Sequence, residues 1–81
     1  SKDLETSPDN LFLLHWKSIC LERLGNVYMF QKAYTDGFEV FEQTLSIKKQ
    51  LVEADPNDIH YQNDLKIISS KYESAKQLAN T

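Results

Sequence analysis

The stretch LSIKKQLVEADPND, residues 45–58, combines the end of a helix with a sharp stop. A residue that precedes a proline avoids the α conformation, so a helix that reaches this stretch must end near Ala54. Pro56 lies 15 residues beyond Phe41, the last aromatic residue before it. A stop that comes so late predicts a long helix. In a chain of 81 residues, it predicts a fold of a few long helices.

Upstream of this stretch, the sequence predicts a helix over residues 36–54. Asp36 is placed to cap its first turn, and Glu39 three residues later completes a capping-box pattern. Apolar or small residues then recur at helical spacing. They form a main stripe of Val40, Thr44, Ile47, Leu51 and Ala54, with Phe38, Phe41 and Leu45 beside it. The charged Glu39, Glu42, Lys49 and Glu53 fall largely outside this stripe.

Downstream, Asp55 and Pro56 predict the cap and the first residue of a third helix over residues 56–79. Its apolar stripe is narrow and consists of Tyr61, Leu65, Ile68, Tyr72, Ala75 and Ala79. The remaining positions are mostly polar. This pattern indicates a helix that packs on one side and faces water on the other, as the end of a helical array requires.

The first helix is expected over residues 8–32, after an N-terminal tail of residues 1–7 in which Ser7 would be the N-cap. One apolar stripe contains Leu13, Trp16, Cys20, Leu24 and Val27. Phe12, Ile19 and Phe30 lie to one side of it, and Leu14, Leu21 and Tyr28 form another line. A helix that is apolar on several sides is packed on several sides, so this helix is expected to be central.

The chain has only two glycines and two prolines, which favours an all-α fold. The short connections between the three helices predict that they are antiparallel. The net charge of −3 and the lack of a basic cluster argue against nucleic-acid binding. No apolar run approaches the length of a membrane span, and no signal peptide is visible. The single cysteine excludes an internal disulfide and suits a reducing compartment, so we expect a cytoplasmic protein. The first residue is not Met, which favours an excerpt of a longer protein.

The residue types that support chemistry are few and scattered. His15 and His60 stand near the starts of their helices and are expected to be surface or boundary residues. Cys20 and Trp16 lie on the apolar stripe and are expected in the core, and the pair Lys48-Lys49 is expected on a solvated face. No metal-binding, nucleotide-binding or catalytic motif occurs. We therefore expect no cofactor, no metal and no enzymatic activity.

The first and third helices are related by an offset of 48 residues, at which Cys20 aligns with Ile68, Leu24 with Tyr72 and Val27 with Ala75. In addition, LGNVY at residues 24–28 resembles the L-G-x-x-Y motif of tetratricopeptide repeats. Gly37, Phe41 and Thr44 stand at the spacings of that family's next small, aromatic and small residues. With its late Pro56, the end of the second helix resembles that of a long bacterial variant of these repeats, which has units of about 48–50 residues.

This resemblance implies a helical hairpin with a capping helix, which would be a fragment of a right-handed α-solenoid. It also implies a non-catalytic scaffold that binds a peptide, a protein or a neighbouring domain in a groove lined by the first and third helices. The outward positions there are Glu22, Asn26, Met29, Lys66, Ser70, Ser74 and Gln77. Asn26 matches an asparagine that some members use to hold a peptide carboxylate. Those members have a lysine one turn before this asparagine, where this chain has Glu22.

The alternative is a homo-oligomerisation or structural module. Leu14, Leu21 and Tyr28 line a side of the first helix that the other two helices are not expected to cover fully, so that it would be exposed in the isolated chain. An exposed apolar side promotes pairing. On this hypothesis the isolated chain forms a homodimer through these three residues, most simply with two-fold symmetry.

Overall fold

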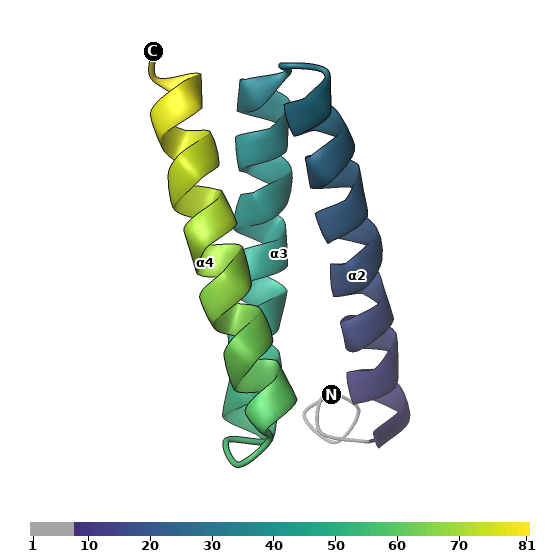
Figure 1. The fold of residues 1–81 in the computed structure, drawn as a ribbon. Coiled ribbons are helices and arrows are strands. Elements are labelled where there is room, and N and C mark those ends of the chain that lie inside the picture. Colours follow the sequence, from purple (N-terminus) through teal and green to yellow (C-terminus); the bar gives the residue numbers. More distant parts are fainter. Residues whose placement is uncertain (1–7) are drawn as a thin grey trace.

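The computed structural model describes residues 8–81, which form three α-helices with no strand among them. The helices are α2 (Pro8–Phe30), α3 (Tyr34–Ala54) and α4 (Ile59–Ala79). They run up, down and up as an elongated bundle of 41 × 20 × 17 Å (Figure 1). The prediction of an all-α fold with three antiparallel helices is confirmed. The expected tail of residues 1–7, with Ser7 as a cap, lies outside the described residues.

The turn after α2 is closed by the backbone. Lys32 adopts a left-handed conformation with φ of 64°. The N–H of Lys32 then donates to the carbonyl of Met29 at 3.0 Å, and the N–H of Ala33 donates to that of Tyr28 at 2.8 Å. These two bonds form a Schellman motif, which satisfies carbonyl groups at the end of the helix. The helix therefore ends at Phe30, two residues earlier than expected.

Two predicted helix starts are wrong. α3 begins at Tyr34 after Ala33, without a side-chain cap, so Asp36 lies inside its first turn. α4 begins at Ile59, and its cap is Asp58 instead of Asp55. The carboxylate of Asp58 accepts hydrogen bonds from the backbone N–H groups of His60 at 2.9 Å and Tyr61 at 3.1 Å. The expected end of α3 at Ala54 is confirmed.

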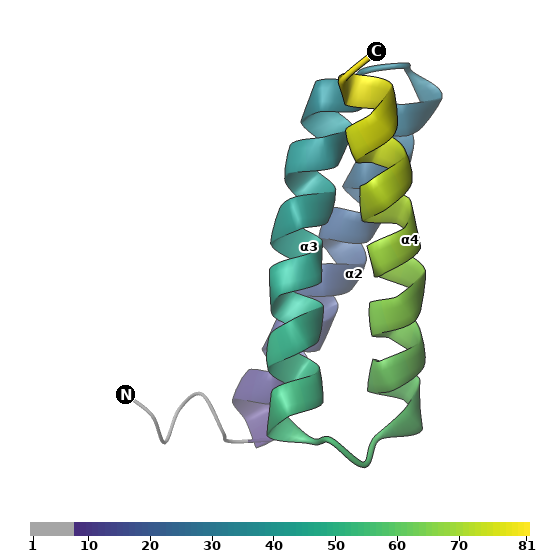
Figure 2. The same ribbon diagram turned by 90° about the vertical axis from the view of Figure 1, so that its left-hand side faces the viewer.

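The helix in the middle of the bundle is α3, because it packs against both α2 and α4 (Figure 1). In the turned view of Figure 2, α3 and α4 stand in front and α2 lies behind them. The prediction that the first helix is central is therefore wrong. Buried residues occur on both sides of α3, and their positions follow a helical spacing that fits two neighbours. They are Gly37, Val40, Phe41, Thr44, Ile47, Lys48 and Leu51.

One cluster of the core consists of Phe41 from α3 with Ile68 and Ala75 from α4. Five partly buried apolar residues surround it: Met29, Phe38, Leu45, Leu65 and Tyr72. The rings of Phe38 and Tyr72 lie 5.2 Å apart, centroid to centroid. The residues predicted beside the stripe of the second helix, Phe38, Phe41 and Leu45, thus meet the predicted stripe of the third helix. Ala54, predicted in the main stripe of the second helix, is exposed.

α2 approaches α3 closely at small residues. A methyl group added at Gly25 would lie 2.8 Å from Cδ1 and 3.0 Å from Cζ of Phe41, which is closer than packed carbon atoms approach. Ser18 lies two turns earlier on the same side and is fully buried, with its hydroxyl donating to the carbonyl of His15 at 2.6 Å. The side of α2 that carries Ser18 and Gly25 therefore faces α3.

Lys48 is buried between α3 and α4, so the prediction that the pair Lys48-Lys49 lies on a solvated face holds only for Lys49. The ammonium group of Lys48 lies 3.5 Å from the carboxylate of Asp64 on α4. A lysine stem is apolar, which lets it pack among hydrophobic neighbours while its charged end reaches a partner. This pairing explains how a charged residue occupies an interior position.

Candidate functional site

A groove lies between α2 and α4, and Phe41 of α3 forms its floor. The other lining residues are Asn26, Met29, Ser70, Lys71 and Ser74. Asn26 and Met29 lie three residues apart on α2, while Ser70 and Ser74 lie four apart on α4, so each pair occupies one face of its helix. The structure thus brings together four of the residues that the sequence placed on the outward faces of the first and third helices.

Lys71 connects the two walls of this groove. Its ammonium group donates to the carboxylate of Glu22 at 2.7 Å and to the amide oxygen of Asn26 at 3.2 Å. Both Lys71 and Glu22 are partly buried. Glu22, which the sequence suggested as a partner contact, is therefore engaged by Lys71. The ammonium group next to Asn26 comes from α4, whereas the family pattern would supply it from one turn earlier on the same helix.

Lys71 could not have been identified from the sequence. Its partners are 49 and 45 residues away, and no local spacing relates them. Lysine on a half-polar helix is ordinarily solvated, and only the crossing of α2 and α4 determines which carboxylate it meets. Helix caps and apolar stripes leave a local signal in the sequence. An ion pair between α2 and α4 leaves no such signal.

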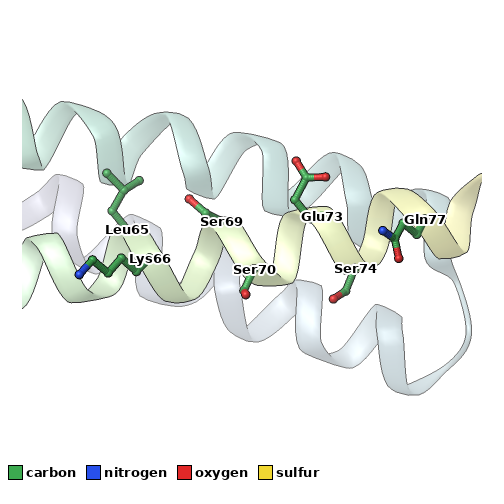
Figure 3. Close-up of a pocket in the computed structure, with 7 residues that line it drawn as sticks. All are labelled: Leu65, Lys66, Ser69, Ser70, Glu73, Ser74 and Gln77. Carbon is green, nitrogen blue, oxygen red and sulfur yellow. The ribbon is translucent and has the colours of Figure 1, made fainter.

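A second, shallow hollow runs along α4 itself (Figure 3). Leu65, Ser69 and Glu73 lie along one edge of it, and Lys66, Ser70 and Ser74 lie along the other, with Gln77 at its end. Lys66, which was predicted to contact a partner, belongs to this hollow and does not line the groove between α2 and α4. Ser70 and Ser74 line both depressions, so the two adjoin on α4.

Toward the turn between α3 and α4, α2 and α4 meet through aromatic rings. The ring centroids of His15 and Tyr61 lie 5.8 Å apart, and Nδ1 of His15 is buried without a hydrogen-bond partner among the described residues. Burial, and then the negative charges of Asp58, Asp55 and Asp64, raise the pKa of Tyr61. His60 is exposed, as expected. Within residues 8–81, no group of three or more His, Cys, Asp or Glu residues is arranged to hold a metal ion.

The side of α2 that faces away from α3 is uncovered and mostly apolar, although Arg23 is also exposed there. Phe12, Leu13, Trp16, Leu24, Val27 and Phe30 are exposed there, and Cys20 is exposed among them. We call these seven residues the outer face of α2. The prediction that Trp16, Cys20 and the stripe around them form the core is therefore wrong.

Leu14, Leu21 and Tyr28 are half-buried. Their spacing places them beside Ser18 and Gly25, on the side of α2 that packs on α3. The prediction that this side is left uncovered is also wrong. The two mistakes have one cause, because α2 contacts α3 through its small residues and their neighbours instead of through its largest side chains.

Comparisons with protein-family models, curated proteins and solved structures found no match to this chain. In the part of the chain that the structure describes, no helix is both long enough and apolar enough to cross a membrane.

Proposed function

We propose that the chain is a non-catalytic scaffold of the tetratricopeptide-repeat type, which binds a peptide or an extended protein segment in the groove between α2 and α4. The observation that carries this proposal is the composition of the groove. It has an aromatic floor at Phe41, an adaptable side chain at Met29, and amide or hydroxyl groups at Asn26, Ser70 and Ser74.

These groups suit the backbone of a peptide. An asparagine amide both donates and accepts hydrogen bonds, and a serine hydroxyl does the same, so together they match the N–H and C=O groups of an extended chain. A methionine side chain is flexible and fits apolar side chains of different shapes. Glu22 pairs with Lys71, which lowers the net charge of the groove. Recognition would therefore rest on hydrogen bonds and shape more than on charge.

The offset of 48 residues supports the repeat interpretation. Ile68 and Ala75 of α4 are fully buried against α3, whereas Cys20 and Val27, their counterparts on α2, are exposed. This is the pattern that a stack of similar helix pairs would produce, because each first helix would pack on the second helix of the unit before it. The contact between Gly25 and Phe41 is consistent with the same interpretation, since both residues belong to the motif that resembles the repeat family.

A peptide-selection experiment tests the proposal. A random peptide library displayed on phage would be selected on the immobilised chain, and the selected peptides would be synthesised and titrated against it by calorimetry. We expect micromolar binding that weakens by about fivefold or more in the Asn26→Ala variant, since one lost hydrogen bond costs about 1 kcal/mol.

The matched control is Asn63→Ala, which removes an exposed amide from α4 outside the groove. It should bind the selected peptides with unchanged affinity. The proposal would be contradicted if the selection yielded no binder, or if Asn26→Ala and Asn63→Ala bound the peptides equally well.

A further inference from the structure

Lys71 holds two side chains of α2 in place beside the groove between α2 and α4. Its ammonium group lies 2.7 Å from the carboxylate of Glu22 and 3.2 Å from the amide oxygen of Asn26. Glu22 and Asn26 are four residues apart on α2, so both lie on the same side of that helix. The position of the Asn26 amide is therefore set by a residue of the opposite wall.

The contact with Lys71 also determines which end of the Asn26 amide is free. An ammonium group has only donors, so it can face the oxygen of an amide but not its NH₂ group. The NH₂ group projects from the same carbon in another direction, and the described residues give it no hydrogen-bond partner. Because Asn26 is exposed and lines the groove, its two N–H donors are available to a ligand, whereas its oxygen is already engaged.

Glu22 limits the effect of the positive charge of Lys71 on a ligand. The two side chains are only 24% and 33% exposed, and their charged ends are in contact. A carboxylate that approached Lys71 would also approach the carboxylate of Glu22, and the repulsion would offset much of the attraction. A neutral carbonyl oxygen meets no such repulsion. The arrangement therefore favours a neutral acceptor over an anion.

From these contacts, and on the basis of the proposed function of the groove, we propose that Lys71 positions Asn26 as a hydrogen-bond donor to a main-chain carbonyl oxygen of the bound peptide. Lys71 is a positioning residue in this arrangement, and Glu22 holds it and offsets its charge. The hydroxyl groups of Ser70 and Ser74 on the other wall can accept as well as donate, so they suit the N–H groups of the same peptide.

The substitution Asn26→Asp tests the role of the NH₂ group, because it replaces the donor by an oxygen and keeps both the size of the side chain and a partner for Lys71. Peptides selected from the random library on the wild-type chain would be titrated by calorimetry. We expect Asn26→Asp to raise the dissociation constant by about tenfold or more, since a hydrogen bond becomes a contact between two acceptors. Unchanged or tighter binding would overturn the proposal, because the ligand would then donate to the oxygen of Asn26.

The matched control is Asn63→Asp, which makes the same change at an exposed asparagine of α4 outside the groove. Its dissociation constant should stay within about twofold of wild type, because exposed charges that are far apart are screened by salt. If Asn63→Asp weakened binding as much as Asn26→Asp does, the effect would come from the added charge and the proposal would be overturned.

A second set of peptides identifies the oxygen that is recognised. These peptides carry a C-terminal amide and alanine at every Asp, Glu, Asn and Gln, so the only amide or carboxylate oxygens left along the chain are those of the main chain. The loss of about tenfold in Asn26→Asp should persist for them. If they no longer bound the wild-type chain, or bound both chains equally, the recognised oxygen would belong to a side chain or a terminal carboxylate, which would overturn the proposal.

A measurement without any peptide tests whether Lys71 positions Asn26. Nuclear magnetic resonance relaxation of the side-chain NH₂ groups reports their motion on the picosecond-to-nanosecond timescale. In wild type the NH₂ group of Asn26 should be more rigid than that of Asn63. In Lys71→Met, which keeps an unbranched stem and removes the donors, the two groups should become equally mobile, and Lys71→Arg should restore the difference. Equal mobility of Asn26 in wild type and Lys71→Met overturns the positioning role.

The two kinds of measurement distinguish a failure of the proposed function from a failure of the role given to Asn26. A selection that yields no peptide overturns the proposed function and the ligand class that rests on it. Peptides that bind wild type and Asn26→Asp equally overturn only the role of Asn26, since the groove would still bind peptides. Circular dichroism on each variant shows whether a loss of binding reflects unfolding.

Discussion

α2 and α4 both pack on α3, yet they do so in opposite ways. α4 buries its apolar stripe, with Ile68 and Ala75 fully covered, and exposes polar residues to water. α2 buries small residues such as Ser18 and Gly25 and exposes its largest apolar side chains. The comparison shows that an apolar stripe identifies a face that is suited to burial, but not the neighbour that will bury it. Close approach at small residues determines which side of α2 meets α3.

The largest expected effect comes from placing the same charge at equivalent positions of the two helices. Ile68→Asp would bury an unpaired carboxylate against α3 and should destabilise the fold by more than about 4 kcal/mol, enough to unfold a small domain. Cys20→Asp, 48 residues earlier, places the carboxylate in water and should cost less than about 1 kcal/mol.

Urea melts followed by circular dichroism would measure both values. They should be recorded at a low protein concentration, so that any self-association does not contribute. Similar losses in the two variants would show that the outer face of α2 is packed in the folded chain, which would contradict the structure.

The contact between α2 and α3 can be broken by a single methyl group. Gly25→Ala would push against the ring of the buried Phe41 and force it to shift, which should destabilise the fold by about 1–3 kcal/mol. Gly37→Ala is the control, because there the nearest atom is the sulfur of Met29 at 2.8 Å, near the end of a flexible side chain. Alanine favours a helix over glycine by about 1 kcal/mol, which offsets the cost of moving Met29.

Thermal melts of the two alanine variants would separate these cases. We expect Gly25→Ala to melt well below wild type and Gly37→Ala to melt within a few degrees of it. If Gly25→Ala were as stable as wild type, the close contact between the two helices would not exist in solution.

Much of the fold could be predicted from the sequence, because the features involved are local. The end of α3 follows from Pro56, and the packing stripe of α4 follows from residues such as Ile68 and Ala75. The observed start of α4 differs from the predicted one because either of two aspartates could serve as its cap, and the cap in the structure is Asp58.

The orientation of α2 could not be predicted, because two of its sides carry apolar residues. Periodicity alone does not show whether the side with Leu14 and Leu21 or the side with Leu13 and Leu24 packs on α3. The same limit applies to the groove. The sequence placed Asn26, Met29, Ser70 and Ser74 on outward positions, but their meeting over Phe41 and the bridge from Lys71 depend on how α2 and α4 flank α3. These contacts join residues more than 40 positions apart and have no local signal.

The ends of α2 and α4 allow a smaller test. Lys32 follows α2 with a φ of 64°, which costs a residue with a side chain about 1 kcal/mol, whereas glycine adopts it freely. Lys32→Gly should therefore stabilise the fold by up to about 1 kcal/mol. Asn80→Gly, at the end of α4, should give no gain because Asn80 has an ordinary φ of −93°. Urea midpoints would compare the two, and an equal shift in both would show that the turn after α2 carries no strain.

The smallest effect is expected at alkaline pH, where α4 meets α2 at Tyr61 and His15. Burial, with the nearby aspartates adding to it, raises the pKa of Tyr61 above its usual value of about 10. The folded state therefore holds the phenol proton more tightly than the unfolded state does. The stability that this difference contributes is fully present below pH ~10 and is lost as the pH rises through the folded-state pKa.

Tyr61→Phe removes the titrating hydroxyl and keeps the ring beside His15. Its free energy of unfolding should fall less steeply than that of wild type between pH ~9 and pH ~11.5, while the two curves should run parallel near neutral pH. Tyr34→Phe, which removes a phenol from the opposite end of the bundle, is the matched control. Urea melts at a series of pH values would measure these slopes. Equal slopes for Tyr61→Phe and wild type would mean that water reaches Tyr61 freely and that α2 and α4 do not close over it.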